Sequence, residues 1–195
     1  MMKNNIDNLK DEELIELVLE NEDMFLHLMR RYESKLIAYI LRISSFSYEE
    51  AEDILQDVFI KVYKNLNNFD TSLKFSSWIY RITHNEVISN FRKNKKVIQI
   101  SDQELQNDIF EKIIDDFDIK EKIDNDYLRK NLMSILNKLD AKYRDVLVLK
   151  YFEEKEYSEI SDILKKPVGT IATLLFRAKK ELKKIIKTEN INLSV

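Results

Sequence analysis

Residues 51–66 read AEDILQDVFIKVYKNL and repeat apolar side chains at intervals of three and four residues. The apolar positions are Ala51, Ile54, Leu55, Val58, Phe59, Val62, Tyr63 and Leu66. This spacing predicts an amphipathic helix with one buried face. Ser47 lies three residues before Glu50, which predicts a capping box at the start of the helix.

Helical patterns flank this segment on both sides. One covers about residues 24–43 and the other about residues 76–92. We therefore expect residues 24–96 to form a bundle of three or four helices. Residues 1–23 are interpreted as an acidic N-terminal segment.

A second group of helical patterns begins at residue 128. Its first stripe consists of Leu128, Leu132, Ile135 and Leu139. Asp140 is then expected to cap the start of a helix with the sequence AKYRDVLVLKYF.

The end of the chain has the outline of a helix-turn-helix. Residues 157–164 and 171–186 predict two helices, and KKPVGT between them holds the only Pro and the only Gly of the chain. We expect an all-α fold with two small helical domains, at 24–96 and 128–186, and a C-terminal tail at 187–195.

Composition excludes several classes of enzyme. The 195 residues include one Gly, one Pro, no Cys and two His, His27 and His84. Glycine-rich phosphate loops and multi-hairpin sheets need more turn residues. Thiol catalysis and Cys/His zinc sites need side chains that are missing here. We expect no enzymatic activity, no cofactor and no metal.

Charge alternates along the chain, although the formal net charge is only −3. Residues 1–24, 25–96, 97–127 and 128–195 carry −6, +4, −7 and +6. The acidic stretch 97–127 is expected to link the two domains. Since there is neither a signal-peptide pattern nor an apolar run of 18 residues, we expect a cytoplasmic protein without membrane insertion.

The last predicted helix carries polar and basic side chains away from its apolar stripe. They are Thr170, Thr173, Arg177 and Lys180. Thr and Arg near the start of a second helix can reach base edges in the major groove, and Lys can neutralise phosphates. A basic surface helix of an ordinary bundle is the alternative interpretation.

The predicted helix at 76–92 combines cations with aromatic rings. Its polar positions are Arg81, His84, Asn85 and Arg92, and the rings in or just before it are Phe69, Phe75, Trp78 and Tyr80. Single-strand sites need this combination, because unpaired bases stack and their phosphates must be neutralised. The alternative is that Trp78, Ile79 and Ile82 belong to the core.

The helix at 51–66 is acidic on the side opposite its apolar face. The residues are Glu52, Asp53, Gln56 and Asp57. Paired carboxylates could serve a metal or a general acid, but no His or second acidic helix accompanies them. A solvated face or a protein-binding surface fits better.

In this order, the segments resemble the bacterial RNA polymerase sigma factors of the extracytoplasmic-function group, in the sigma-70 superfamily. AEDILQDVFIKVYKNL and FSSWIYRITHNEVISNFRK are similar to conserved region 2 of that family. LDAKYRDVLVLKYFEEKEYSEISDILKKPVGTIATLLFRAKKEL is similar to region 4.

The resemblance implies an alternative sigma factor that binds core RNA polymerase and directs promoter recognition and melting, without catalysing a reaction. It implies core contacts at Asp53, Gln56 and Asp57. Residues 67–74 would capture a flipped base of the −10 element, and the implied −10 contacts are Asn67, Asn68, Phe69, Asp70, Lys74, Trp78, Arg81, Asn85 and Arg92. The implied −35 contacts are Thr170, Thr173, Arg177 and Lys180. The acidic linker would lie in positively charged channels of the polymerase, and a simple tether between the two domains is the alternative.

Four positions depart from the usual pattern of the family. Leu174 stands where Arg is common and Phe176 where His is frequent, so the −35 contact is expected to differ. Ser89 replaces a common Asp. Lys155 replaces a common Gly, so the turn before the helix-turn-helix must form without that residue.

Two other classes of function stay open at this point. One is a helix-turn-helix repressor that binds DNA without polymerase, and the other is a helical adaptor that binds only proteins. The aromatic-rich match to region 2 argues against both. A cognate anti-sigma factor is a further candidate partner.

Overall fold

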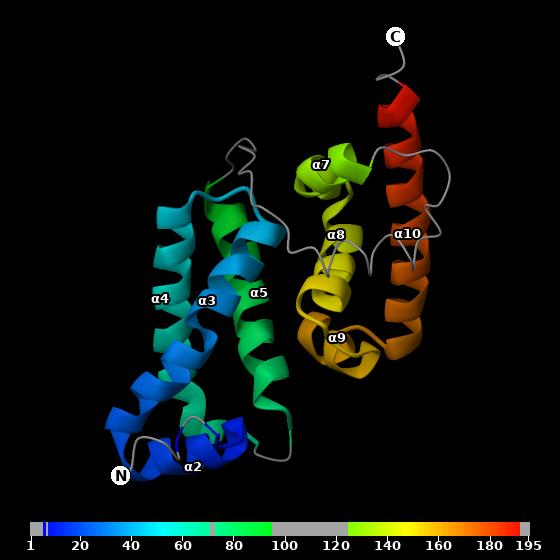
Figure 1. Cartoon of the computed structure of the whole chain (residues 1–195). Coiled ribbons are helices and arrows are strands. Elements are labelled where there is room, and N and C mark those ends of the chain that lie inside the picture. Colours follow the sequence, from blue (N-terminus) through cyan, green and yellow to red (C-terminus); the bar gives the residue numbers. More distant parts are fainter. Residues whose placement is uncertain (1–5, 7, 71–72, 95–124, 192–195) are drawn as a thin grey trace. The chain divides into compact units, whose positions relative to one another are not determined.

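In the computed structural model, the described residues are 6, 8–70, 73–94 and 125–191. Every regular element among them is helical, which confirms the predicted all-α class. The helices form two units, coloured blue to green and yellow-green to red in Figure 1. The predicted acidic linker lies outside the described residues except at positions 125–127, which are helical.

Three long helices that lie alongside one another build the first unit (Figure 1). They are α3 (Phe25–Ile43), α4 (Tyr48–Asn65) and α5 (Phe75–Asn94), and each contacts the other two. Their bounds closely match the predicted helices at 24–43, 51–66 and 76–92.

The apolar face of α4 is buried as its spacing predicts. Its buried residues are Ala51, Ile54, Leu55, Val58, Phe59 and Val62. At its start, Ser47 Oγ accepts from the Glu50 N–H at 3.2 Å, and Glu50 Oε2 accepts from the Ser47 N–H at 2.9 Å. The predicted capping box is therefore confirmed.

Tyr63 is the exception on this face, because its side chain is 42% exposed. Its ring makes an edge contact with Phe25, with 5.2 Å between centroids. A hydrogen bond to the Glu22 side chain raises the pKa of Tyr63. Its hydroxyl thus has a polar partner at the border of the core.

The acidic N-terminal segment contains a helix that sequence analysis did not predict, α2 (Asp11–Glu20). It buries Leu14, Ile15 and Val18 and contacts α3 and α5. Acidic residues in the first turn stabilise the start of a helix. Asp11, Glu12 and Glu13 occupy the first turn of α2 and therefore favour its formation.

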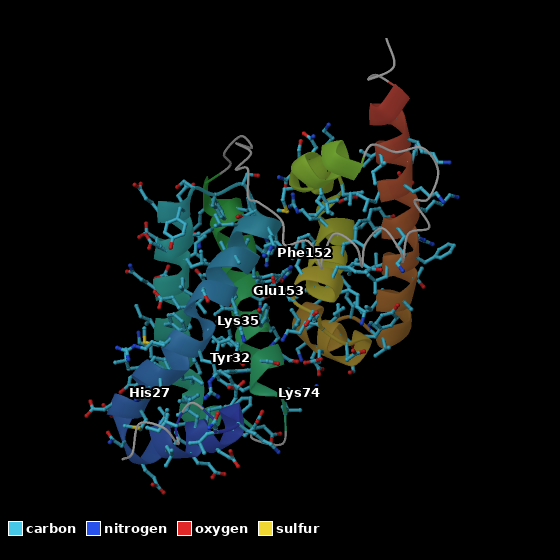
Figure 2. The ribbon with its side chains drawn as sticks, viewed as in Figure 1. His27, Tyr32, Lys35, Lys74, Phe152 and Glu153 are labelled. Carbon is cyan, nitrogen blue, oxygen red and sulfur yellow. The ribbon has the colours of Figure 1, made fainter. Side chains whose placement is uncertain are left out.

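An ion-pair cluster joins α2 to α3. Asp11 accepts from Arg31 Nη1 at 2.7 Å and from the Tyr32 hydroxyl. Burial, and then the hydrogen bond to Asp11, raise the pKa of Tyr32 above its usual value. Figure 2 shows Tyr32 and Lys35 on α3, and the Lys35 ammonium lies 5.9 Å from the centre of the Tyr32 ring.

The second unit consists of α7 (Asn125–Asn137), α8 (Ala141–Leu147), α9 (Tyr157–Leu164) and α10 (Val168–Ile191). The apolar stripe of α10 is buried against α7 and α8 and consists of Ile171, Leu175, Ala178, Leu182 and Ile186. The residues predicted as a tail at 187–195 are helical as far as Ile191.

Asp140 occupies the N-cap position of α8 but makes no side-chain capping hydrogen bond. Its carboxylate instead lies 2.8 Å from Lys142 Nζ, and this hydrogen bond lowers the pKa of Asp140. The predicted N-cap position of Asp140 is therefore confirmed, although its carboxylate pairs with the Lys142 ammonium.

The turn before the helix-turn-helix forms without glycine. The segment Val148–Phe152 is a π-helix, and Glu154 follows it in the left-handed region with φ 51°. The Lys155 N–H then donates to the Leu149 carbonyl at 2.9 Å. The unusual backbone conformation thus falls on Glu154, one residue before the position where the family commonly has Gly.

Lys165 ends α9 in the left-handed region, with φ 53° and ψ 47°. A left-handed conformation costs an L-residue roughly 1 to 2 kcal/mol, which exceeds the roughly 0.5 to 1 kcal/mol of entropy that glycine loses on folding. We therefore expect Lys165→Gly to stabilise the protein by about 0.5 to 1 kcal/mol. Thermal unfolding followed by circular dichroism measures this as a higher Tm. Lys166→Gly is the matched control, since that residue has no positive φ, and an equal rise in Tm there would contradict the explanation.

Candidate nucleic-acid and protein interfaces

The outer face of α4 carries the predicted core polymerase contacts. Asp53, Gln56 and Asp57 are all exposed, opposite the buried apolar face. Residues three and four apart are neighbours on a helix, so these side chains form one continuous surface. Ile60 extends it by one turn and is 50% exposed. Sequence analysis missed Ile60 because it stands among core positions.

An aromatic cluster fixes the start of the loop between α4 and α5. The short 3-10 helix η2 (Leu66–Asn68) leads to Phe69, which is only 8% exposed. The Phe69 ring lies 5.5 Å from the Phe75 ring and 5.1 Å from the Trp78 ring, measured between centroids. Phe69, predicted to contact DNA, is thus largely covered by these two rings.

The other described loop residues predicted to contact DNA are exposed. They are Asn67, Asn68, Asp70 and Lys74. Figure 2 shows Lys74 at the end of the loop, immediately before α5. Residues 71 and 72 of this loop lie outside the described residues.

A pocket of about 510 Å³ opens beside the loop. Its lining residues are Lys61, Asn65, Asn68, Trp78, Ile82, Asn85, Glu86 and Ser89. It brings together three predicted −10 contacts, Asn68 from η2 and Trp78 and Asn85 from α5. The alternative interpretation assigns Trp78, Ile79 and Ile82 to the core. Of these three, Ile79 is buried, whereas Trp78 and Ile82 are only partly buried.

Two predicted cations lie on the same side of α5 as Asn85. Arg81 is four residues before it and partly exposed, and Arg92 is seven residues after it and exposed. Phosphates of a strand that enters the pocket could therefore be neutralised along the helix. His84 does not line the pocket.

The pocket also contains a buried carboxylate that sequence analysis did not select. The Glu86 side chain is 5% exposed and accepts from Lys61 Nζ of α4. Most Glu residues on helices are solvated, so the sequence carries no signal that this one is covered.

Helix α2 contacts the start of α5 through a carboxylate. Glu12 Oε1 accepts from the Phe75 N–H at 3.3 Å. The first N–H groups of a helix lack partners within it, so Glu12 satisfies one of them. The N-terminal segment thereby supports the end of the predicted base-capture loop.

The outer face of α10 holds all four predicted −35 contacts. Thr170, Thr173, Arg177 and Lys180 are exposed, opposite the buried stripe. The Thr173 hydroxyl donates to the Gly169 carbonyl at 2.9 Å. Lys142 of α8 lies close enough to Arg177 for their positive charges to interact. Lys142 thus adds a cation to this surface that sequence analysis missed.

The two unusual residues of α10 differ in their surroundings. Phe176 is 71% exposed and stands next to Arg177 on the outer face. Leu174 is only partly exposed. Of the two, Phe176 thus presents the larger apolar surface to a ligand of this face.

Neither a metal site nor a membrane span is found in the part of the chain that the structure describes. No group of three His, Asp or Glu side chains there could hold a metal ion. No helix there is long and apolar enough to cross a bilayer.

Family models match both units. The model of sigma-70 region 2 matches residues 28–97, and the model of sigma-70 region 4 matches residues 129–182.

Curated relatives match most of the chain. The extracytoplasmic-function RNA polymerase sigma factor SigW of Bacillus subtilis is 33% identical over 171 residues, which are 86% of this chain and 91% of the relative. The RNA polymerase sigma-H factor of Pseudomonas aeruginosa is 27% identical and covers 91% of this chain and 94% of its own length.

Solved structures share the fold. CnrH, in complex with the cytosolic domain of CnrY, superposes with a TM-score of 0.67 at 20% identity, covering 91% of this chain and 97% of its own. The sigma factor RpoE of Bartonella quintana, in complex with the anti-sigma factor NepR, gives a TM-score of 0.63 at 22% identity. The match covers 84% of this chain and 96% of the RpoE chain.

Proposed function

The chain belongs to the extracytoplasmic-function group of the sigma-70 family, and from this premise we propose how its exposed surfaces divide the work of a sigma factor. It is an alternative sigma factor that directs RNA polymerase to promoters, and like other sigma factors it is a non-enzymatic subunit. It binds core polymerase and DNA. We place it in the cytoplasm, where its polymerase works.

The acidic face of α4 is proposed to dock on core polymerase. Asp53, Gln56 and Asp57 are exposed and contiguous, which a charge-complementary interface requires. Ile60 adds apolar area to the same face. Mixed polar and apolar surfaces of this kind are typical of protein interfaces.

The loop and α5 are proposed to hold the melted −10 strand. The pocket beside Asn68, Trp78 and Asn85 carries this assignment, because it offers a partly exposed indole and three side-chain amide groups in one concave site. Flipped bases are bound by stacking and by hydrogen bonds to their Watson–Crick edges. Phe69 is proposed to act indirectly, by anchoring the loop on Phe75 and Trp78.

The outer face of α10 is proposed to read the −35 duplex. The second helix of a helix-turn-helix enters the major groove with its N-terminal residues, which here include Thr170 and Thr173. From Val168 to Lys187 the helix has six basic residues and one acidic residue. This charge suits a phosphate backbone.

An anti-sigma protein is proposed as a regulator of this chain. The solved relative from Bartonella quintana is in complex with such a protein. The exposed surfaces of α4 and α10 are the ones that such a partner would have to cover in order to block both polymerase and DNA.

We expect the isolated protein to bind promoter DNA weakly and to gain specificity with core polymerase. Two DNA-reading units of one chain gain little from each other unless their spacing is fixed. Run-off transcription and promoter binding, each with and without purified core, measure this. Tight specific binding by the free protein, unchanged by core and without a transcript, would instead favour a repressor.

A further inference from the structure

Glu86 is a buried carboxylate in the pocket proposed to receive a flipped base. It lies one residue after Asn85 on α5, and its side chain is 5% exposed. With Asn68, Trp78 and Asn85 it lines the same concave site. Burying an ionised group costs free energy unless partners compensate for it.

The partners of Glu86 leave part of its hydrogen-bonding capacity open. One oxygen accepts from Lys61 Nζ, and the other lies 3.3 Å from Asn90 Nδ2, a long contact. An ionised carboxylate has about four acceptor positions and no donor. A ligand with an N–H group can therefore be accepted in addition, whereas a carbonyl oxygen would be repelled.

The remaining lining suits a flat ring. Trp78 and Ile82 are partly exposed and provide apolar surface for stacking, and the Asn68 and Asn85 amides can donate and accept. The volume of about 510 Å³ lies within the range of roughly 300 to 1,000 Å³ that is common for small-molecule sites.

We infer that Glu86 makes this pocket selective for a flipped base with an exocyclic amino group, which is cytosine or adenine. The amino N–H of such a base donates to the carboxylate. Thymine carries a carbonyl oxygen at the same position of its Watson–Crick edge, so it places two acceptors face to face. This inference rests on the proposed role of the pocket in holding the melted −10 strand.

The test uses holoenzyme and promoter templates that are already mismatched across the −10 element. At each non-template position in turn, cytosine is replaced by thymine or by 2-pyrimidinone, and adenine by unsubstituted purine. The two last analogues lack only the amino group. Open-complex formation is measured for each template. At one position, removal of the amino group should lower open-complex formation by wild-type holoenzyme about tenfold, the factor that corresponds to 1.4 kcal/mol.

Glu86→Gln should remove most of the discrimination against thymine at that position, since an amide can donate to a carbonyl as well as accept from an amine. Lys61→Gln is the matched control. This variant breaks the same ion pair but should keep the preference for an amino-bearing base. If both variants lose the discrimination against thymine equally, the role of the ion pair is purely structural.

The outcomes separate this inference from the proposed function. If wild-type holoenzyme opens all analogue templates equally well, Glu86 selects no amino group, and this result needs no variant. Retention of the thymine discrimination by Glu86→Gln would overturn the inference as well. Absence of promoter-dependent transcription on every template, mismatched or not, would instead contradict the function proposed for the chain.

Discussion

Asp53→Lys combined with Asp57→Lys should abolish association with core polymerase while the fold stays intact. Both side chains are exposed on α4 and lie away from its buried face. Surface changes of this kind alter stability by about 0.5 kcal/mol or less. Like charges placed opposite each other across an interface cost several kcal/mol, so binding should be lost. Co-purification with core and helix content by circular dichroism measure the two effects.

Glu16→Lys combined with Glu20→Lys is the matched control for this charge reversal. These two residues are exposed, four positions apart and on a helix of the same unit, α2. The control variant changes the net charge equally, so it should co-purify with core at the wild-type yield. Equal retention of core by both double variants would show that the α4 face is not the docking surface.

The helices of both units could be predicted because periodic burial dominates their sequences. On α4, the side chains at intervals of three and four are those that the structure buries, from Ala51 to Val62. On α10, the predicted stripe from Ile171 to Leu182 is likewise buried. Side chains off these stripes are exposed for the same geometric reason. The candidate contacts on α4 and α10 were therefore accessible to sequence analysis.

Two of the features that sequence analysis missed depend on contacts between distant segments, and a third is a local backbone conformation. Glu12 becomes a cap of α5 only because α2 packs against that helix. Glu86 is buried on α5, which packs against α4, and its ion-pair partner Lys61 comes from α4. The left-handed conformation of Glu154 falls one residue from the position that the resemblance indicated. In each case the residue type has no preference that reveals its surroundings.

Arg177→Ala should lower transcription most strongly from promoters that depend on the −35 element. The side chain is exposed on the outer face of α10, beside Thr173 and Lys180. If the guanidinium makes a bidentate base contact, the loss is about 1 to 3 kcal/mol, which is roughly 5- to 150-fold. A phosphate contact would give a similar loss on every −35 sequence. Transcription from templates with altered −35 elements distinguishes these cases.

Asn67→Ala combined with Asn68→Ala should instead impair opening at the −10 element, because both residues are exposed in the loop proposed to capture a flipped base. Removing a base from the stack costs a few kcal/mol, and a template already mismatched across the −10 element removes most of that cost. Run-off transcription on this template should therefore rescue the loop variant but not Arg177→Ala. Since the two substitutions lie on separate helical units, their defects on ordinary templates should also add. Rescue of Arg177→Ala by the mismatched template, or failure to rescue the loop variant, would contradict the assignment of melting to the loop and duplex reading to α10.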